Sequence, residues 1–172
     1  EGNGAIMAMP HLGGWEWSGF WVTQVRDHPV TAVVERLDPP ELFEWFVELR
    51  RSFGFEIVAL GPEAGAATAR ALKANHVLAL VCDRDLTGTG PEVEFFGERT
   101  TLPGGPATLA LRTGAALLPT AIYFDGPDTR RSVVLPALDT SRHGKLRDDV
   151  QRVTQDLAHA LEDLIRRAPE QW

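Results

Sequence analysis

The sequence contains a single cysteine, Cys82, and no long apolar segment. One cysteine can form neither an internal disulfide nor a cysteine-based zinc site, so the expected compartment is the reducing cytosol. No apolar run approaches the roughly 20 residues that span a bilayer, so no transmembrane helix is predicted. The chain begins at Glu1 without a methionine and enters an apolar run almost at once, so we expect it to be truncated at both ends.

Positive charge is also scarce. Lysine and arginine number 17 against 24 aspartates and glutamates, a net charge of −7. No nucleic-acid partner is expected, because non-specific binding depends on displacing counterions from phosphates. A membrane surface stays open as a partner, since a local basic or apolar patch is enough for docking. With 44% hydrophobic and 24% charged residues, the composition is typical of a folded chain, and the length suits one domain over residues 1–172.

Strand-like apolar runs alternate with segments of helical period, which predicts an α/β domain with a mixed, largely parallel central sheet flanked by helices. The expected strands cover residues 5–9, 31–34, 55–60, 77–82, 116–124 and 132–135. The expected helices cover residues 15–25, 40–53, 63–74, 106–113 and 146–167. In the last helix one apolar stripe is expected to pack on the sheet, through Leu146, Val153, Leu157 and Leu164.

Residues 10–16, with the sequence PHLGGWE, form the first candidate for chemistry. His11 follows a predicted strand, two glycines come next, and Glu16 lies in the first turn of a predicted helix. Sites in open α/β sheets gather at the carboxyl ends of strands. If Glu16 points back to His11, its carboxylate fixes the imidazole tautomer and leaves the other ring nitrogen free as a base. We therefore expect these side chains to lie together facing a cleft, the alternative being an ordinary strand-end histidine beside an exposed glutamate.

Residues 83–105 form a long segment rich in glycine, threonine and charge, with only a short extended piece at 93–96. Segments of that length in compact domains are typical of functional loops. Asp83, Arg84 and Asp85 leave an apolar strand in succession, so they need solvent, one another or a ligand. A solvated charged turn is the alternative to a site.

Other candidates flank predicted elements. Gly104 and Gly105 precede a helix with proline in its first turn, where open backbone N–H groups suit a phosphate or an oxyanion. Glu35 closes the second predicted strand, and Arg50 lies near the end of the second predicted helix. A glycine-rich helix start and a basic helix C-terminus are both commonplace, so these residues carry little weight alone.

Several common sites are missing from the sequence. It has no G-x-S-x-G motif of a serine hydrolase and no P-loop, and no G-x-G-x-x-G follows the first predicted strand. No metal site is predicted, because the histidines are scattered without ligand spacing, at His11, His28, His76, His143 and His159.

A family resemblance rests on spaced segments that occur in one order along the chain. The segments are 11–16 (HLGGWE), 83–90 (DRDLTGTG), 93–98 (VEFFGE), 102–106 (LPGGP), 113–119 (TGAALLP) and 169–172 (PEQW). The first is similar to the motif of a histidine, four residues and an acid in the lysophospholipid-acyltransferase superfamily. The set resembles its bacterial branch of lipid A lauroyl/myristoyl acyltransferases, and most closely the actinobacterial phosphatidylinositol mannoside acyltransferases. It spans essentially the whole chain.

The resemblance implies that a fatty acyl group passes from acyl-CoA, or from an acyl-carrier protein, to a hydroxyl of a glycolipid. The expected acceptor is of the phosphatidylinositol mannoside type, and the expected place is the cytoplasmic face of the cell membrane, bound peripherally. Acyl-CoA is a co-substrate, and no cofactor or metal is implied. A lipid A-type acyltransferase and a non-catalytic lipid-binding module on the same fold are the alternatives.

The resemblance also assigns roles. His11 is the general base and Glu16 its partner, although the mannoside acyltransferases usually carry Asp at the latter position. Such enzymes use a carboxylate near the histidine, and the resemblance implies that Asp83 or Asp85 provides it here. Glu35 falls at a position that resembles a further active-site residue.

The site is expected to open between the His11 turn, residues 83–85 and the helix start at 104–105, because the donor needs an apolar groove beside a place for its phosphates. Arg50, at another position that resembles an active-site residue, and Arg84 are expected at the rim, since a guanidinium binds phosphate in bidentate fashion. Alternatively, Arg84 only pairs with an aspartate of its own segment and holds the loop.

Overall fold

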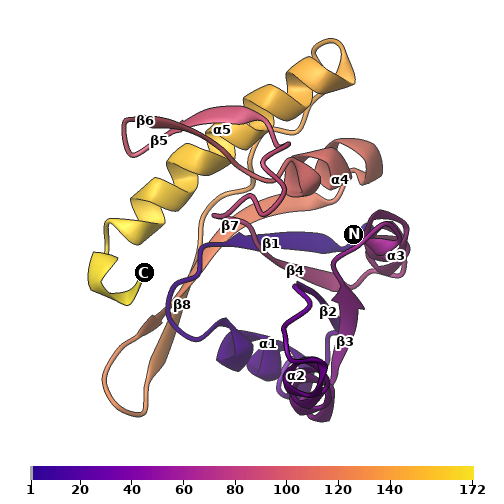
Figure 1. The fold of residues 1–172 in the computed structure, drawn as a ribbon, viewed down its shortest axis with the longest axis vertical. Helices are drawn as coiled ribbons and strands as arrows, with labels where there is room; N and C mark the ends of the chain where they lie inside the picture. Colours follow the sequence, from indigo (N-terminus) through magenta and orange to yellow (C-terminus); the bar gives the residue numbers. More distant parts are fainter. Residues whose placement is uncertain (1) are drawn as a thin grey trace.

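The computed structural model describes residues 2–172, which form a six-stranded sheet between two layers of helices (Figure 1). The strand order is β3-β2-β4-β1-β7-β8. The parallel strands are β1 (Ala5–Met9), β2 (Val30–Val34), β3 (Phe55–Ala59), β4 (Val77–Val81) and β7 (Ala116–Phe124). At one edge β8 (Arg130–Val134) pairs antiparallel with β7. The predicted mixed, largely parallel α/β class is confirmed.

The helices divide between the two faces of the sheet (Figure 1). One face carries α1 (Trp15–Gln24) and α2 (Pro40–Ser52). The other face carries α3 (Ala64–Lys73), α4 (Gly105–Thr113) and α5 (Leu146–Ile165). Proline in the first turn of α2 fits there because that position needs no N–H donor, and left-handed Gly114, with φ of 73°, ends α4.

The long helix α5 packs on the sheet through the predicted stripe. Val153, Leu157 and Leu164 are fully buried, and Leu146 at the start of the helix is half-buried. The phenolic O–H of Tyr123, in β7, donates to the backbone carbonyl of Leu164 over 2.7 Å. This hydrogen bond satisfies a buried hydroxyl and fixes the helix against the sheet.

The segment after β4 contains a hairpin that the sequence pattern did not predict in full. Its strands, β5 (Glu92–Phe95) and β6 (Glu98–Thr101), pair antiparallel around a turn in which Phe96 and Gly97 both have positive φ. Such turns usually carry Asn, Asp or Gly at the first of these positions. Because phenylalanine stands there instead, the sequence lacks the usual signal of a hairpin. The hairpin lies against α5, and a short helix η1 (Pro169–Gln171) follows α5 near the end of the chain.

The strand order places the ends of β1 and β4 side by side. Met9 is opposite Val81, and the backbone N–H of Cys82 donates to the carbonyl of Met9 over 2.9 Å. After β1 the next helix, α1, lies on one face, whereas after β4 and the hairpin the next helix, α4, lies on the other. At such a switch point the two connections diverge and open a crevice at the carboxyl ends of the strands.

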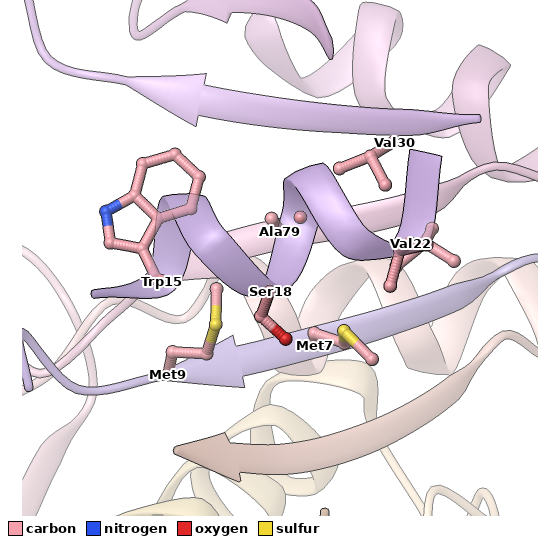
Figure 2. Close-up of a pocket in the computed structure, with 9 residues that line it drawn as sticks. Met7, Met9, Trp15, Ser18, Val22, Val30 and Ala79 are labelled. Atoms are coloured by element: carbon pink, nitrogen blue, oxygen red, sulfur yellow. The ribbon is translucent and has the colours of Figure 1, made fainter. Parts of the chain in front are cut away.

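Below α1, by contrast, the side chains leave little room. Figure 2 shows Met7 and Met9 of β1 beneath the helix, with Trp15 and Val22 of α1 above them. The gap that they enclose measures about 10 Å³, close to the least volume that holds a single water molecule. The gap under α1 is therefore too small for a substrate.

Candidate active site

His11 and Asp83 meet at the switch point, each in the loop that follows its strand. The Nδ1 atom of His11 lies 2.6 Å from Oδ1 of Asp83, and the backbone N–H of His11 donates to Oδ2 of Asp83 over 2.9 Å. Two contacts between the same two residues fix the orientation of the carboxylate relative to the ring. The pair is thus a product of the β1–β4 pairing and not of closeness in sequence.

The pairing determines which ring nitrogen of His11 can act as a base. Because Nδ1 donates its hydrogen to the carboxylate of Asp83, Nε2 carries the free lone pair. Within residues 2–172 that Nε2 atom has no hydrogen-bond partner, and the His11 side chain is 55% exposed and lines a cavity. Nε2 is therefore positioned to accept a proton from a bound hydroxyl.

Asp83 is held in its charged form. Its side chain is only 4% exposed, and burial alone would raise its pKa. Hydrogen bonds from the ring and backbone of His11 and from the indole of Trp172 outweigh burial and keep the pKa of Asp83 below its ordinary value. An ionised carboxylate at Nδ1 stabilises the imidazolium that forms when His11 takes up a proton.

Glu16 is not the residue that fixes the tautomer of His11, so that prediction is wrong. The first turn of α1 directs Glu16 toward α2, where Nη2 of Arg50 donates to its Oε1 over 2.9 Å. Arg50 also lies over the rings of Trp15 and Phe46, each at 5.2 Å from the guanidinium carbon to the ring centroid. Glu16 therefore contributes to the site through Arg50.

The two aspartates of residues 83–85 have different surroundings. Asp85 accepts hydrogen bonds from the backbone N–H of Thr87 and of Gly90, and from the Thr87 hydroxyl. Although burial opposes them, these donors lower the pKa of Asp85 to about 2. Asp85 thus organises its loop, and the carboxylate at His11 belongs to Asp83.

Arg84 pairs with neither neighbouring aspartate. Its Nη2 atom donates to Oε2 of Glu35 over 2.7 Å, across the ends of β4 and β2. The expected alternative pairing within its own segment is therefore wrong, since the partner comes from the adjacent strand. Both side chains of this ion pair are about half exposed, so water screens it.

Gly13 allows the His11 loop to lie against the sheet. Its φ is +61°, and a Cβ there would lie 1.8 Å from the carbonyl oxygen of Ile122, in β7. No residue with a side chain fits such an approach without moving the backbone. The glycine after Leu12 therefore sets how closely the loop follows the neighbouring strand.

A cavity of about 840 Å³ is lined by His11 and extends between α3 and α4. Its volume lies in the range of ligand-binding clefts, roughly 300–1,000 Å³. The predicted site residues that line it are His11, Glu35, Arg50, Arg84, Asp85, Gly104 and Gly105. Between the facing helices it is lined by mostly small or apolar residues and by one arginine, namely Ala64, Gly65, Thr68, Ala69, Gly105, Pro106, Thr108, Leu109, Arg112 and Thr113.

The start of α4 opens onto this cavity. Gly104 is the N-cap and Gly105 the first helical residue, and no side chain in residues 2–172 caps this helix end with a hydrogen bond. Backbone N–H groups at a helix start favour negative charge. The helix start is thus placed to face an anion or an oxyanion in the same cavity as His11.

Cys82 is excluded as a nucleophile by its surroundings. Its side chain is buried, and burial together with the charge of Asp83 raises the pKa of the thiol far above neutrality. Only the thiolate is an effective nucleophile. The chemistry of the cavity therefore centres on the histidine.

Trp172 was not predicted as a site residue. Its indole Nε1–H donates to Oδ2 of Asp83 over 2.7 Å. The motif 169–172 gave a sequence signal for the segment, but no pattern indicates that it folds back to the end of β4.

Comparisons with known proteins show the family to which the chain belongs. A family model described as bacterial lipid A biosynthesis acyltransferase matches residues 1–172. The chain belongs to this family. Relatives named phosphatidylinositol mannoside acyltransferase, from Mycobacterium tuberculosis and Mycolicibacterium smegmatis, are each 43% identical to it over 99% of the chain. The chain spans about half of their length, 53% and 55% respectively.

Membership of the acyltransferase family confirms the resemblance seen in the sequence. None of the helices formed by residues 2–172 is both long and apolar enough to cross a bilayer.

Proposed function

We propose that this protein transfers a fatty acyl group from acyl-CoA to a hydroxyl of a glycolipid of the phosphatidylinositol mannoside type. The observation that carries the proposal is the His11–Asp83 pair, whose histidine lines a cavity of about 840 Å³. The family supports acyl transfer, and the names of the 43% identical relatives support the acceptor class. Intact base and carboxylate weigh against a non-catalytic lipid-binding module.

In the proposed reaction, Nε2 of His11 takes the proton of the acceptor hydroxyl as its oxygen attacks the thioester carbonyl. The carbonyl oxygen becomes an oxyanion, which the N–H groups at the start of α4 are placed to stabilise. Collapse of this intermediate forms the ester and breaks the C–S bond, and the CoA thiolate recovers the proton from His11. Acyl-CoA is a co-substrate in this scheme, and the steps call for no further cofactor.

The acyl chain is assigned to the part of the cavity between α3 and α4. Ala64, Ala69 and Leu109 give it an apolar wall there, which suits a hydrocarbon chain, and Arg112 of α4 adds a charged group. Ala69 of α3 and Leu109 of α4 line it from facing helices. The depth of this groove then sets the preferred length of the acyl group.

Ala69→Phe is expected to shorten the usable groove. Transfer of a palmitoyl group should fall about 5- to 150-fold, because placing the chain in a volume that the new ring occupies costs about 1–3 kcal/mol, whereas transfer of an octanoyl group should change less than about twofold. The measurement is kcat/KM for both donors. Ala66→Phe is the matched control, since Ala66 is exposed on the same helix and does not line the cavity. Equal losses for long and short donors would place the chain elsewhere.

Arg50 and Arg84 are proposed to bind the phosphates of the donor. Both line the cavity, and Arg50 is only 14% exposed, with an Nε atom that has no hydrogen-bond partner within residues 2–172. A buried donor without a partner is costly unless a ligand satisfies it. Arg84 is exposed and joined to Glu35, so we assign it a weaker role at the rim.

Arg50→Ala is expected to weaken acyl-CoA binding about tenfold and to reduce its salt dependence, with smaller changes in the same direction for Arg84→Ala. Titration calorimetry across a salt series measures both quantities. Arg51→Ala is the control, because Arg51 is exposed beside Arg50 and does not line the cavity. If both variants bind acyl-CoA like the parent at every salt concentration, the donor's phosphates lie elsewhere.

A lipid A-type acceptor with a carrier-protein donor is the second candidate, because the family model bears that description. In both cases the acceptor is a lipid, so we propose that the protein works peripherally at the cytoplasmic face of the membrane. Exposed tryptophans of α1 and α2, Trp17, Trp21 and Trp45, are suited to an interface.

The test supplies the full-length protein with labelled palmitoyl-CoA or palmitoyl-carrier protein. Liposomes contain either phosphatidylinositol mannoside or a lipid A precursor, and mass spectrometry identifies the product. Sedimentation of the protein with the same liposomes tests the membrane assignment. Acylated mannoside formed from palmitoyl-CoA is the expected product. Acylation of the lipid A precursor alone would favour the second candidate, and no acylation of either lipid would end both.

A further inference from the structure

Asp83 has a hydrogen-bond donor that the reaction scheme above does not use. The indole Nε1–H of Trp172 donates to Oδ2 over 2.7 Å, and the same oxygen accepts the backbone N–H of His11 over 2.9 Å. The other oxygen, Oδ1, lies 2.6 Å from the His11 ring. Because the Asp83 side chain is only 4% exposed, these protein donors take the place of water around the carboxylate.

The position of the Trp172 ring is set by the β5–β6 hairpin. The ring stacks on Phe96 with centroids 5.6 Å apart and an interplanar angle of 30°, and it meets Phe95 edge-on at 6.1 Å. The hairpin is itself held to α5, where Glu162 accepts the backbone N–H of Phe96 over 2.9 Å. The indole therefore approaches Asp83 from a fixed platform, even though 52% of the residue is exposed.

The residue before it joins the same segment to the His11 loop. The side chain of Gln171 accepts the backbone N–H of Phe124 over 2.8 Å and donates to its carbonyl over 3.1 Å. The carbonyl of Gln171 accepts the N–H of Gly13 over 3.3 Å. The turn at 169–172 thus contacts β7, the His11 loop and Asp83 together.

We propose that Trp172 is a positioning residue of the acyl transfer, whose indole N–H holds the Asp83 carboxylate so that Nδ1 of His11 stays bound and Nε2 faces the cavity. This inference rests on the proposed function. A carboxylate turns about its Cβ–Cγ bond, and the Trp172 donor restrains that turn. Trp172 acts through Asp83 and does not line the cavity.

The test removes the indole N–H while keeping an aromatic ring. Trp172→Phe in the full-length protein is expected to lower kcat about tenfold, the usual loss for one hydrogen bond to a charged group, and to leave the KM for acyl-CoA within about twofold. Replacement by 3-benzothienylalanine, which has the shape of tryptophan and lacks the N–H, should give the same loss. Arg131→Ala is the matched control, because it removes a hydrogen-bond donor to another aspartate, Asp125, and both residues are exposed and do not line the cavity.

A double-mutant cycle separates positioning from packing. If Trp172 acts through Asp83, adding Trp172→Phe to Asp83→Asn should change kcat less than about twofold, because the group that it positions is already lost. An equal loss in both backgrounds, an effect confined to KM, or a parent-like kcat in both Trp172 variants would overturn the inference. A His11→Ala protein with the parent's activity would instead refute the proposed function. Failure of the inference on Trp172 and failure of the proposed function are therefore distinguishable.

Discussion

Replacing His11 by alanine is expected to lower kcat by about 10³-fold while leaving the fold intact. A hydroxyl attacks a thioester slowly unless a base takes its proton, and a positioned general base contributes typically 10²–10⁴-fold. The ring nitrogen that faces the cavity is the base in the proposed reaction. The side chain is 55% exposed and is not part of the core, so the fold should persist, whereas the loss of its hydrogen bond to the buried carboxylate of Asp83 should lower the melting temperature. The measurement is steady-state acyl transfer together with the thermal melting temperature.

The control for this variant is another exposed histidine. His28 precedes β2 and does not line the cavity, so His28→Ala should keep the parent's kcat and melting temperature. A His11→Ala protein that melts like the parent and still transfers acyl groups at the parent's rate would contradict the proposed mechanism. If His11→Ala instead fails to melt cooperatively, His11→Gln replaces it as the test, because glutamine retains a polar side chain of similar size.

The fold was largely predictable because local patterns determine it. Buried parallel strands appear as short apolar runs, and α5 shows its buried stripe at helical spacing, so both are visible without knowledge of any neighbour. The β5–β6 hairpin was only half predicted. Its turn uses Phe96 in a left-handed conformation, which local propensity disfavours and packing on α5 and Trp172 supports.

The site was only partly predictable because it depends on strand order. His11 and the segment 83–85 were both identified, and the family resemblance implied that a carboxylate of Asp83 or Asp85 lies near the histidine. No pattern along the chain itself shows that β4 lies beside β1. That pairing brings Asp83 to the histidine, whereas closeness in sequence suggested Glu16. Trp172 lies even further from its partner in sequence, 89 positions from Asp83. It reaches Asp83 because η1 folds back to the end of β7, where Gln171 is hydrogen-bonded to Phe124.

Asp83→Asn is expected to lower kcat by about 10³–10⁴-fold, with little change in the KM for acyl-CoA. An asparagine amide can turn its NH₂ group toward Nδ1 of His11, which then accepts, and the proton moves to Nε2. The tautomer with a protonated Nε2 cannot act as the base, and the analogous change in a Ser-His-Asp triad costs about 10⁴-fold. Asp85→Asn distinguishes the two aspartates, because Asp85 contacts its own loop and its loss should cost only about tenfold.

The pH dependence of stability gives a second measurement on Asp83→Asn. The pKa of Asp83 is depressed in the folded protein, so its charge stabilises the fold above the unfolded pKa of about 3.9, and this contribution is lost as the pH falls through the folded value. The parent should therefore exceed the variant in free energy of unfolding at pH 7, and the difference should shrink as the pH falls below about 4. Urea denaturation of the parent and the variant, at pH 7 and again below about pH 4, measures this difference. If the stability difference is independent of pH, or if Asp85→Asn loses more activity than Asp83→Asn, then Asp83 is not the carboxylate that supports the base.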